Sequence, residues 1–164
     1  MKKIVLIFAL VICANAFAQI HDPVKWSTSV EKISDTEYEL IAIASIDGEW
    51  HLYSQMVPED GPIPTNFVYE GNANYLKKGN TKEGKGHTID DPVFNMRIKY
   101  FGKKATFKQR IKLKSKTSFK INAVVEFMVA RLDFKSAIKG LLFWIVWVEK
   151  NIGMTLSIMI SGTF

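Results

Sequence analysis

The chain has 164 residues, of which 48% are hydrophobic and 23% charged, with 22 basic and 16 acidic side chains and one cysteine. This length suits one domain with a core of its own, and the average charged fraction argues against wholesale disorder. The single cysteine excludes an intramolecular disulfide, a thiolate zinc cluster and a dithiol redox motif.

The first 18 residues have the pattern of a secretory signal peptide. A lysine pair precedes the apolar run Ile4–Ile12, and Ala16–Ala18 places small residues at both positions that signal peptidase reads. We expect cleavage after Ala18 and export to the periplasm. The only cysteine, Cys13, lies in this segment. Because the isoleucine before it is not the small residue of a lipoprotein box, we expect no lipid anchor there and no cysteine in the mature chain.

The signal peptide also removes two lysines and no acid, so the formal charge falls from +6 to +4. That charge is too mild to indicate a nucleic-acid partner.

The mature body shows the two-residue alternation of half-buried antiparallel strands. In the stretch 104–114, Gln109 is the only polar residue on the apolar face. Seven short strands with no convincing helix and no internal repeat predict a β-sandwich. The expected strands are Val24–Ile33, Glu37–Ala44, Trp50–Met56, Thr65–Tyr69, Met96–Phe101, Lys104–Lys114 and Phe119–Val129.

Three segments between these strands carry turn signals. Pro58–Pro64 contains three prolines and cannot be a central strand. Phe101–Lys104 predicts a hairpin joining its two flanking strands. Gly79–Gly86 nearly spells a phosphate-binding P-loop, but glycine stands where the motif needs a hydroxyl for the metal ion. No strand or helix is expected around it, so this segment is predicted to be a solvated basic loop.

No arrangement of residues indicates metal binding or a nucleophile. His21, His51 and His87 are far apart in the sequence and have no carboxylate at ligand spacing, so no metal site and no cofactor are expected. The serine-hydrolase elbow is absent, and without a mature cysteine a Cys–His nucleophile is impossible.

One further stretch has an alternating row of bases. This row could contact an anionic partner, or it could simply keep the outer face of a sheet soluble. The bases are Lys108, Arg110, Lys112 and Lys114.

The last 34 residues differ in character from the body. Two apolar blocks, Gly140–Val148 and Ile152–Phe164, are separated by Glu149–Asn151. Neither block has the roughly 20 apolar residues that a spanning helix needs. A tail helix bound to a membrane and a tail never selected to fold both remain open.

Several motifs, taken in order, resemble the N-terminal periplasmic domain of DsbD-type thiol:disulfide interchange proteins, in particular those of Bacteroidetes-type bacteria. The resemblance covers about residues 19–129. It is carried by Asp22–Trp26, Gly48–Gln55, Pro58–Thr65, Asp91–Phe94, Tyr100–Phe101 and Val125–Val129.

The resemblance implies an immunoglobulin-like antiparallel β-sandwich that carries reducing equivalents across the cell envelope. Such a domain exchanges disulfides with thioredoxin-like periplasmic proteins, including those of cytochrome c biogenesis. It also implies a loop with an aromatic residue that caps the active disulfide. Asp91 and Phe94 fall where that cap would lie, with Phe94 as the shield.

The resemblance stops where the redox centre should begin. Ala130 stands at the position of the first active cysteine, and neither a second cysteine nor a proline follows. Since exchange needs a thiolate attacking a sulfur, we expect a redox-inactive domain rather than an enzyme. The closing strand of the sandwich is also expected to be missing.

The expected organisation is therefore a signal peptide at 1–18, a DsbD-like domain at 19–130 and a divergent apolar tail at 131–164. A frameshift near codon 130 is the hypothesis for the tail, and a paralogue with a different C-terminus is its alternative. The rival for the whole protein is a non-catalytic envelope binding or adhesion module that shares only the sandwich fold.

Overall fold

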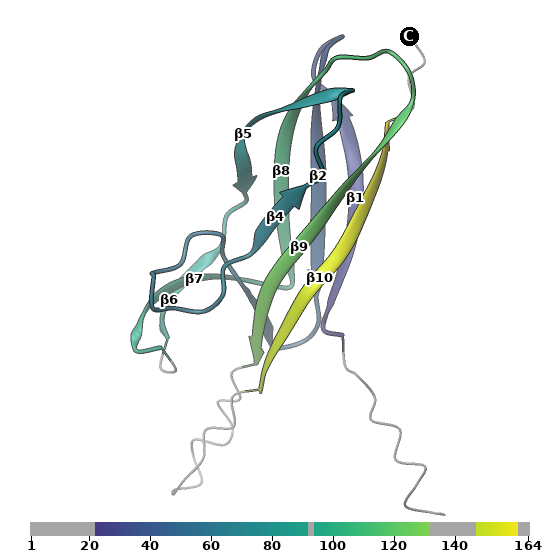
Figure 1. Cartoon of the computed structure of the whole chain (residues 1–164). Helices are drawn as coiled ribbons and strands as arrows, with labels where there is room; N and C mark the ends of the chain where they lie inside the picture. Colours follow the sequence, from purple (N-terminus) through teal and green to yellow (C-terminus); the bar gives the residue numbers. More distant parts are fainter. Residues whose placement is uncertain (1–21, 92–93, 132–146, 161–164) are drawn as a thin grey trace, which may run out of the picture.

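The computed structural model describes residues 22–91, 94–131 and 147–160, and this part of the chain is strand and loop without helix. Two antiparallel sheets pack face to face, and Figure 1 shows β9 and β10 crossing in front of β1 and β2. The predicted fold class, an immunoglobulin-like antiparallel β-sandwich, is confirmed. Sheet A has the order β1 (Val24–Lys32), β2 (Glu37–Ile46), β8 (Lys104–Leu113) and β5 (Tyr75–Glu83). Sheet B has the order β10 (Trp147–Ile160), β9 (Phe119–Arg131), β3 (Trp50–Tyr53), β7 (Met96–Gly102) and β6 (His87–Asp91), and β4 (Asn66–Tyr69) also pairs with β9.

The core lies between the sheets and is rich in aromatic rings. Trp26 of β1 packs its ring 5.9 Å from Phe67 of β4, 5.8 Å from Phe107 of β8 and 5.5 Å from Phe127 of β9. These residues alternate with solvent-facing neighbours in their strands, so the two-residue period read in the sequence is what delivers them to one layer. Aromatic burial of this extent supplies much of the apolar area that holds the two sheets together.

Strands β3 and β4 pair with successive segments of β9. Leu52 pairs with Val129 and Asn66 with Glu126, so both strands run antiparallel to β9. The twelve residues between them leave the sheet as a loop, and its base is closed by Thr65, whose N–H donates to the Ser54 carbonyl over 3.2 Å. This proline-rich loop is the segment that the sequence excluded from a central strand.

Gln109, the predicted exception on an apolar face, is fully buried because it completes a β-bulge. Strand β5 slips its register against β8 between Lys78 and Lys82. The Gln109 amide donates to the carbonyls of Lys78 and Gly79 over 3.2 and 3.3 Å, and its oxygen accepts from the Thr81 hydroxyl over 2.9 Å. A buried polar side chain is tolerated here because it satisfies backbone groups that the bulge leaves without ladder partners.

Two expectations about local structure are wrong. Phe101–Lys104 is not a hairpin, since β7 lies in sheet B and β8 in sheet A, and Lys103 turns the chain between the sheets with a φ of 60°. The stretch 79–86 is not simply a loop, because β5 extends to Glu83 and β6 begins at His87. Gly86 is required there, since a Cβ on it would lie 2.7 Å from the Tyr100 carbonyl oxygen.

The closing strand that was expected to be missing is present. β10 pairs with β9 along its whole length, from Trp147 opposite Arg131 to Ile160 opposite Phe119, with one irregularity between Asn151 and Met154. The first 18 residues and the segment 132–146 lie outside the described residues. Within the described part, no helix has the length and apolar character to cross a membrane.

Candidate functional site

The candidate site lies on the outer face of sheet B, where the ends of β3, β7 and β9 meet. Ala130 is 1% exposed and forms a small apolar cluster with buried Tyr53 and Ile98. Phe94 and Met128 are partly buried against the same cluster. In the sheet, Ala130 stands directly opposite His51 of β3. The methyl group of Ala130 is thus enclosed on the side of sheet B that faces away from the main core.

Asp91 ties the segment around Phe94 to the sheet. Its carboxylate is buried and accepts a hydrogen bond from the Tyr53 hydroxyl over 3.2 Å and one from the Phe94 N–H over 3.3 Å. The rings of Tyr53 and Phe94 meet edge to face, with centroids 6.1 Å apart. Burial, and then the negative charge of Asp91, raise the pKa of the Tyr53 hydroxyl. Tyr53 therefore stays protonated at neutral pH and donates to the carboxylate.

Glu83 anchors the other loop that borders the site. Its side chain is 2% exposed and accepts from Lys99 Nζ over 2.7 Å, from the Ser54 hydroxyl over 2.6 Å and from the Gln55 N–H over 2.8 Å. The contacts join β5 of sheet A to the 54–65 loop and to β7 of sheet B. This buried carboxylate fixes the start of the 54–65 loop, from which Val57 reaches the Ala130 cluster.

Two histidines contact one tyrosine ring beside the cluster. The ring centroids of His51 and His87 lie 4.3 Å and 5.8 Å from that of Tyr100. Gly102 of β7 is opposite His51, and a Cβ there would make an ordinary contact of 3.7 Å with the His51 ring. Burial is the main cause that lowers the pKa of His51; nearby Asp91 and Glu49 oppose the change and His87 adds to it.

We predict that His51 makes the fold less stable in mild acid. The pKa of its side chain is lower in the folded chain than its ordinary 6.5, so the unfolded chain binds more protons as the pH falls through 6.5. Stability present at pH 7.5 should therefore decline towards pH 5.5. Urea denaturation at both pH values measures the loss, and His51→Gln should lose less than the unmodified chain. Equal losses in the two proteins would contradict this assignment.

The structure brings together three residues that the sequence singled out at separate positions. Asp91, Phe94 and Ala130 lie at one end of sheet B, linked through Tyr53. Sequence reasoning missed Tyr53 and Glu83 as parts of the site, because nothing in a single strand's pattern signals a contact between strands distant in the chain. Among the described residues, no group of three or more histidine, cysteine or acidic side chains could hold a metal ion.

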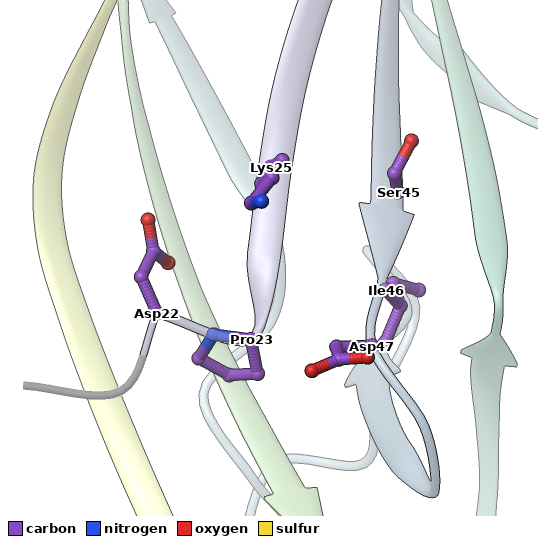
Figure 2. Close-up of a pocket in the computed structure, with 6 residues that line it drawn as sticks. All are labelled: Asp22, Pro23, Lys25, Ser45, Ile46 and Asp47. Carbon is purple, nitrogen blue, oxygen red and sulfur yellow. The ribbon is translucent and has the colours of Figure 1, made fainter.

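A cavity of about 420 Å³ lies elsewhere, where β1 begins and β2 ends. Figure 2 shows its lining side chains around Pro23. The cavity is open and combines the carboxylates of Asp22 and Asp47 with the ammonium group of Lys25. It includes none of the residues around Ala130, and its mixed charges define no ligand class.

Comparisons with known proteins give a similarity of structure but none of sequence. No family model matches the chain, and no curated protein matches it in sequence. Among solved structures, the reduced N-terminal domain of DsbD from Neisseria meningitidis is similar with a TM-score of 0.40 and 12% identity. The similarity covers 91% of this chain and 93% of that one.

Proposed function

We propose that this chain is an exported domain of the thiol–disulfide interchange type that binds thioredoxin-like proteins in the periplasm without exchanging disulfides. One observation carries the proposal. Ala130, which takes the place of the first active cysteine in the sequence resemblance, is buried in the same cluster as Phe94, which takes the place of the cap. This cluster supports the proposal of a capped redox site in which a methyl group stands where the sulfur would be.

The chemistry of the site supports binding rather than catalysis. Disulfide exchange forms a mixed disulfide through attack by a thiolate, and the only cysteine of the chain, Cys13, lies in the expected signal peptide. An alanine side chain neither attacks a disulfide nor accepts attack. Contacts of the partner with the apolar surface around Phe94 and Met128 would remain available, because they do not need sulfur.

The first test is a thiol measurement on the mature chain. We expect no thiol to titrate in denaturant, and no covalent complex with a thioredoxin-fold protein whose resolving cysteine is replaced by serine. Installing the sulfur by Ala130→Cys should give one thiol that reacts slowly in the folded protein, because position 130 is 1% exposed. Adding Phe94→Ala should speed its labelling by about tenfold if Phe94 covers the position.

A cysteine far from the site provides the control. Met159 on β10 is 65% exposed, so Met159→Cys should label fast and should not respond to Phe94→Ala. Noncovalent binding of the unmodified mature chain is measured by NMR. Adding the partner is expected to shift the signals of Tyr53, Phe94 and Ala130. Shifts confined to other surfaces, or a mixed disulfide formed by the mature chain, would overturn the proposal. The first of these results would favour the binding or adhesion module.

A further inference from the structure

The outer face of sheet A is a broad surface with an excess of bases. The strand registers place seven basic and three acidic side chains on this face, so its formal charge is +4. The bases are Lys25, Lys78, Lys82, Lys104, Lys108, Arg110 and Lys112, and the acids are Glu31, Glu37 and Glu39. Asp22 and Asp47 at the cavity beside Lys25 lower the total to +2 when they are included.

Ion pairing compensates the bases of this surface unevenly. Glu37 pairs with Lys78 and Glu39 pairs with Lys108, each over 2.7 Å, and Asp22 and Asp47 lie beside Lys25 at the other end. Lys82 and Lys104 form no ion pair with another described residue.

The opposite surface of the sandwich has the reverse charge. Among the described side chains, the outer face of sheet B has one base, Lys120, and two acids near its surface, Glu70 and Glu126, while Asp91 is buried. The two faces therefore give the domain a charge asymmetry directed across the sandwich. Such an asymmetry orients a protein in the field of a charged surface before any contact forms.

We propose that the outer face of sheet A lies against an anionic phospholipid surface. This rests on the proposed export of the chain, and it would turn the Ala130 site, on the outer face of sheet B, away from the membrane. Bases within a Debye length of anionic headgroups are attracted to them. The difference in charge between the outer faces of sheets A and B favours contact through sheet A. Docking of a soluble partner and membrane contact would then use opposite sides of the domain.

The layout of the bases favours a lipid surface over an acidic protein. With strands about 4.8 Å apart and about 3.4 Å per residue, the four strands spread these bases over roughly 14 by 27 Å. They surround half-exposed Ile41 and Ile43 rather than a cavity. Headgroups that diffuse laterally can meet bases scattered over such a surface, whereas a protein needs carboxylates fixed at matching positions.

The test compares two variants with the same loss of charge. The mature chain is sedimented with vesicles of phosphatidylcholine alone and with vesicles containing phosphatidylglycerol, at low and at physiological salt. We expect binding only to the anionic vesicles, weakened by salt. Lys82→Gln with Lys104→Gln should lower the partition coefficient by about tenfold. Lys116→Gln with Lys120→Gln, which removes exposed bases outside this face, should change it by less than about threefold.

Three outcomes would overturn the proposal. They are an absence of binding to anionic vesicles at low salt, equal losses in the two variants, and binding to polyglutamate but not to vesicles, which would assign the surface to an acidic polypeptide. Circular dichroism confirms that each variant folds. Lys82 and Lys104 lie on the face opposite Ala130, so failure here leaves the binding of thioredoxin-like proteins to be judged by its own assay.

Discussion

Truncating two side chains on the inner side of β10 is expected to cost a large part of the stability of the domain. Leu156 and Ile158 are 8% and 6% exposed and belong to the two apolar clusters between the sheets. Each truncation of a buried Leu or Ile to Ala costs about 2–5 kcal/mol, so Leu156→Ala with Ile158→Ala should lose about 4 kcal/mol or more. A domain of this size has about 5–15 kcal/mol in total. Urea denaturation followed by tryptophan fluorescence measures the difference.

The same strand supplies a matched control. Ser157 and Met159 alternate with the two core residues and point outward, with Met159 65% exposed. Ser157→Ala with Met159→Ala should therefore change the free energy of unfolding by less than about 1 kcal/mol. If both double variants unfold at the same urea concentration as the original chain, β10 does not contribute to the core. The hypothesis that residues 131–164 are an unselected tail would then gain support.

The sequence predicted most of the strands that bury a face and missed two that have little buried surface, β5 and β6. β8 and β9 alternate buried and exposed positions almost without exception, and their period was clear. β5 is exposed at Leu76–Asn80, and β6 is five residues long, so neither has a buried period to detect. Both are sheet edges, where lysines and a bulge oppose pairing with other chains.

The prediction of a hairpin at 101–104 was wrong for a different reason. The same residues that allow a tight turn within a sheet also allow a passage between two sheets, and Lys103 at positive φ serves the second purpose. In sequence, β10 follows an apolar block and could not be distinguished from a tail without its partner. Only the register with β9 shows that Leu156 and Ile158 face inward.

The candidate site was predictable only in part. Asp91, Phe94 and Ala130 came from the resemblance of short motifs, whose order along the chain is visible in one sequence. The residues that hold them could not be found in this way, because Tyr53 is 38 positions from Asp91. Long-range hydrogen bonds leave no local period, and Glu83 lies inside a segment that looked like a solvated loop. Its burial follows from contacts of the end of β5 with Ser54, Gln55 and Lys99.

Glu83→Gln is expected to cause the largest loss from a single substitution near the site, about 3 kcal/mol. The change leaves Lys99, which is 29% exposed, beside a neutral amide and weakens the hydrogen bonds to Ser54 and Gln55. Removing one partner of a buried ion pair is costly because the other charge stays desolvated without compensation. Urea denaturation measures the loss, and hydrogen exchange at Gln55 and Met56 should accelerate as the loop is released.

A second ion pair of the same length but greater exposure serves as a control, because it tests whether the cost of Glu83→Gln comes from burial or from the loss of a charge. Glu37 and Lys78 are also 2.7 Å apart, but their side chains are 23% and 49% exposed. Glu37→Gln should therefore cost much less stability than Glu83→Gln, because water solvates whichever charge is left. Glu83→Gln with Lys99→Met should recover part of the stability lost in Glu83→Gln, since no uncompensated ammonium group remains. Equal costs for Glu83→Gln and Glu37→Gln would show that the carboxylate at position 83 is solvated, and that the 54–65 loop is held by its backbone contacts alone.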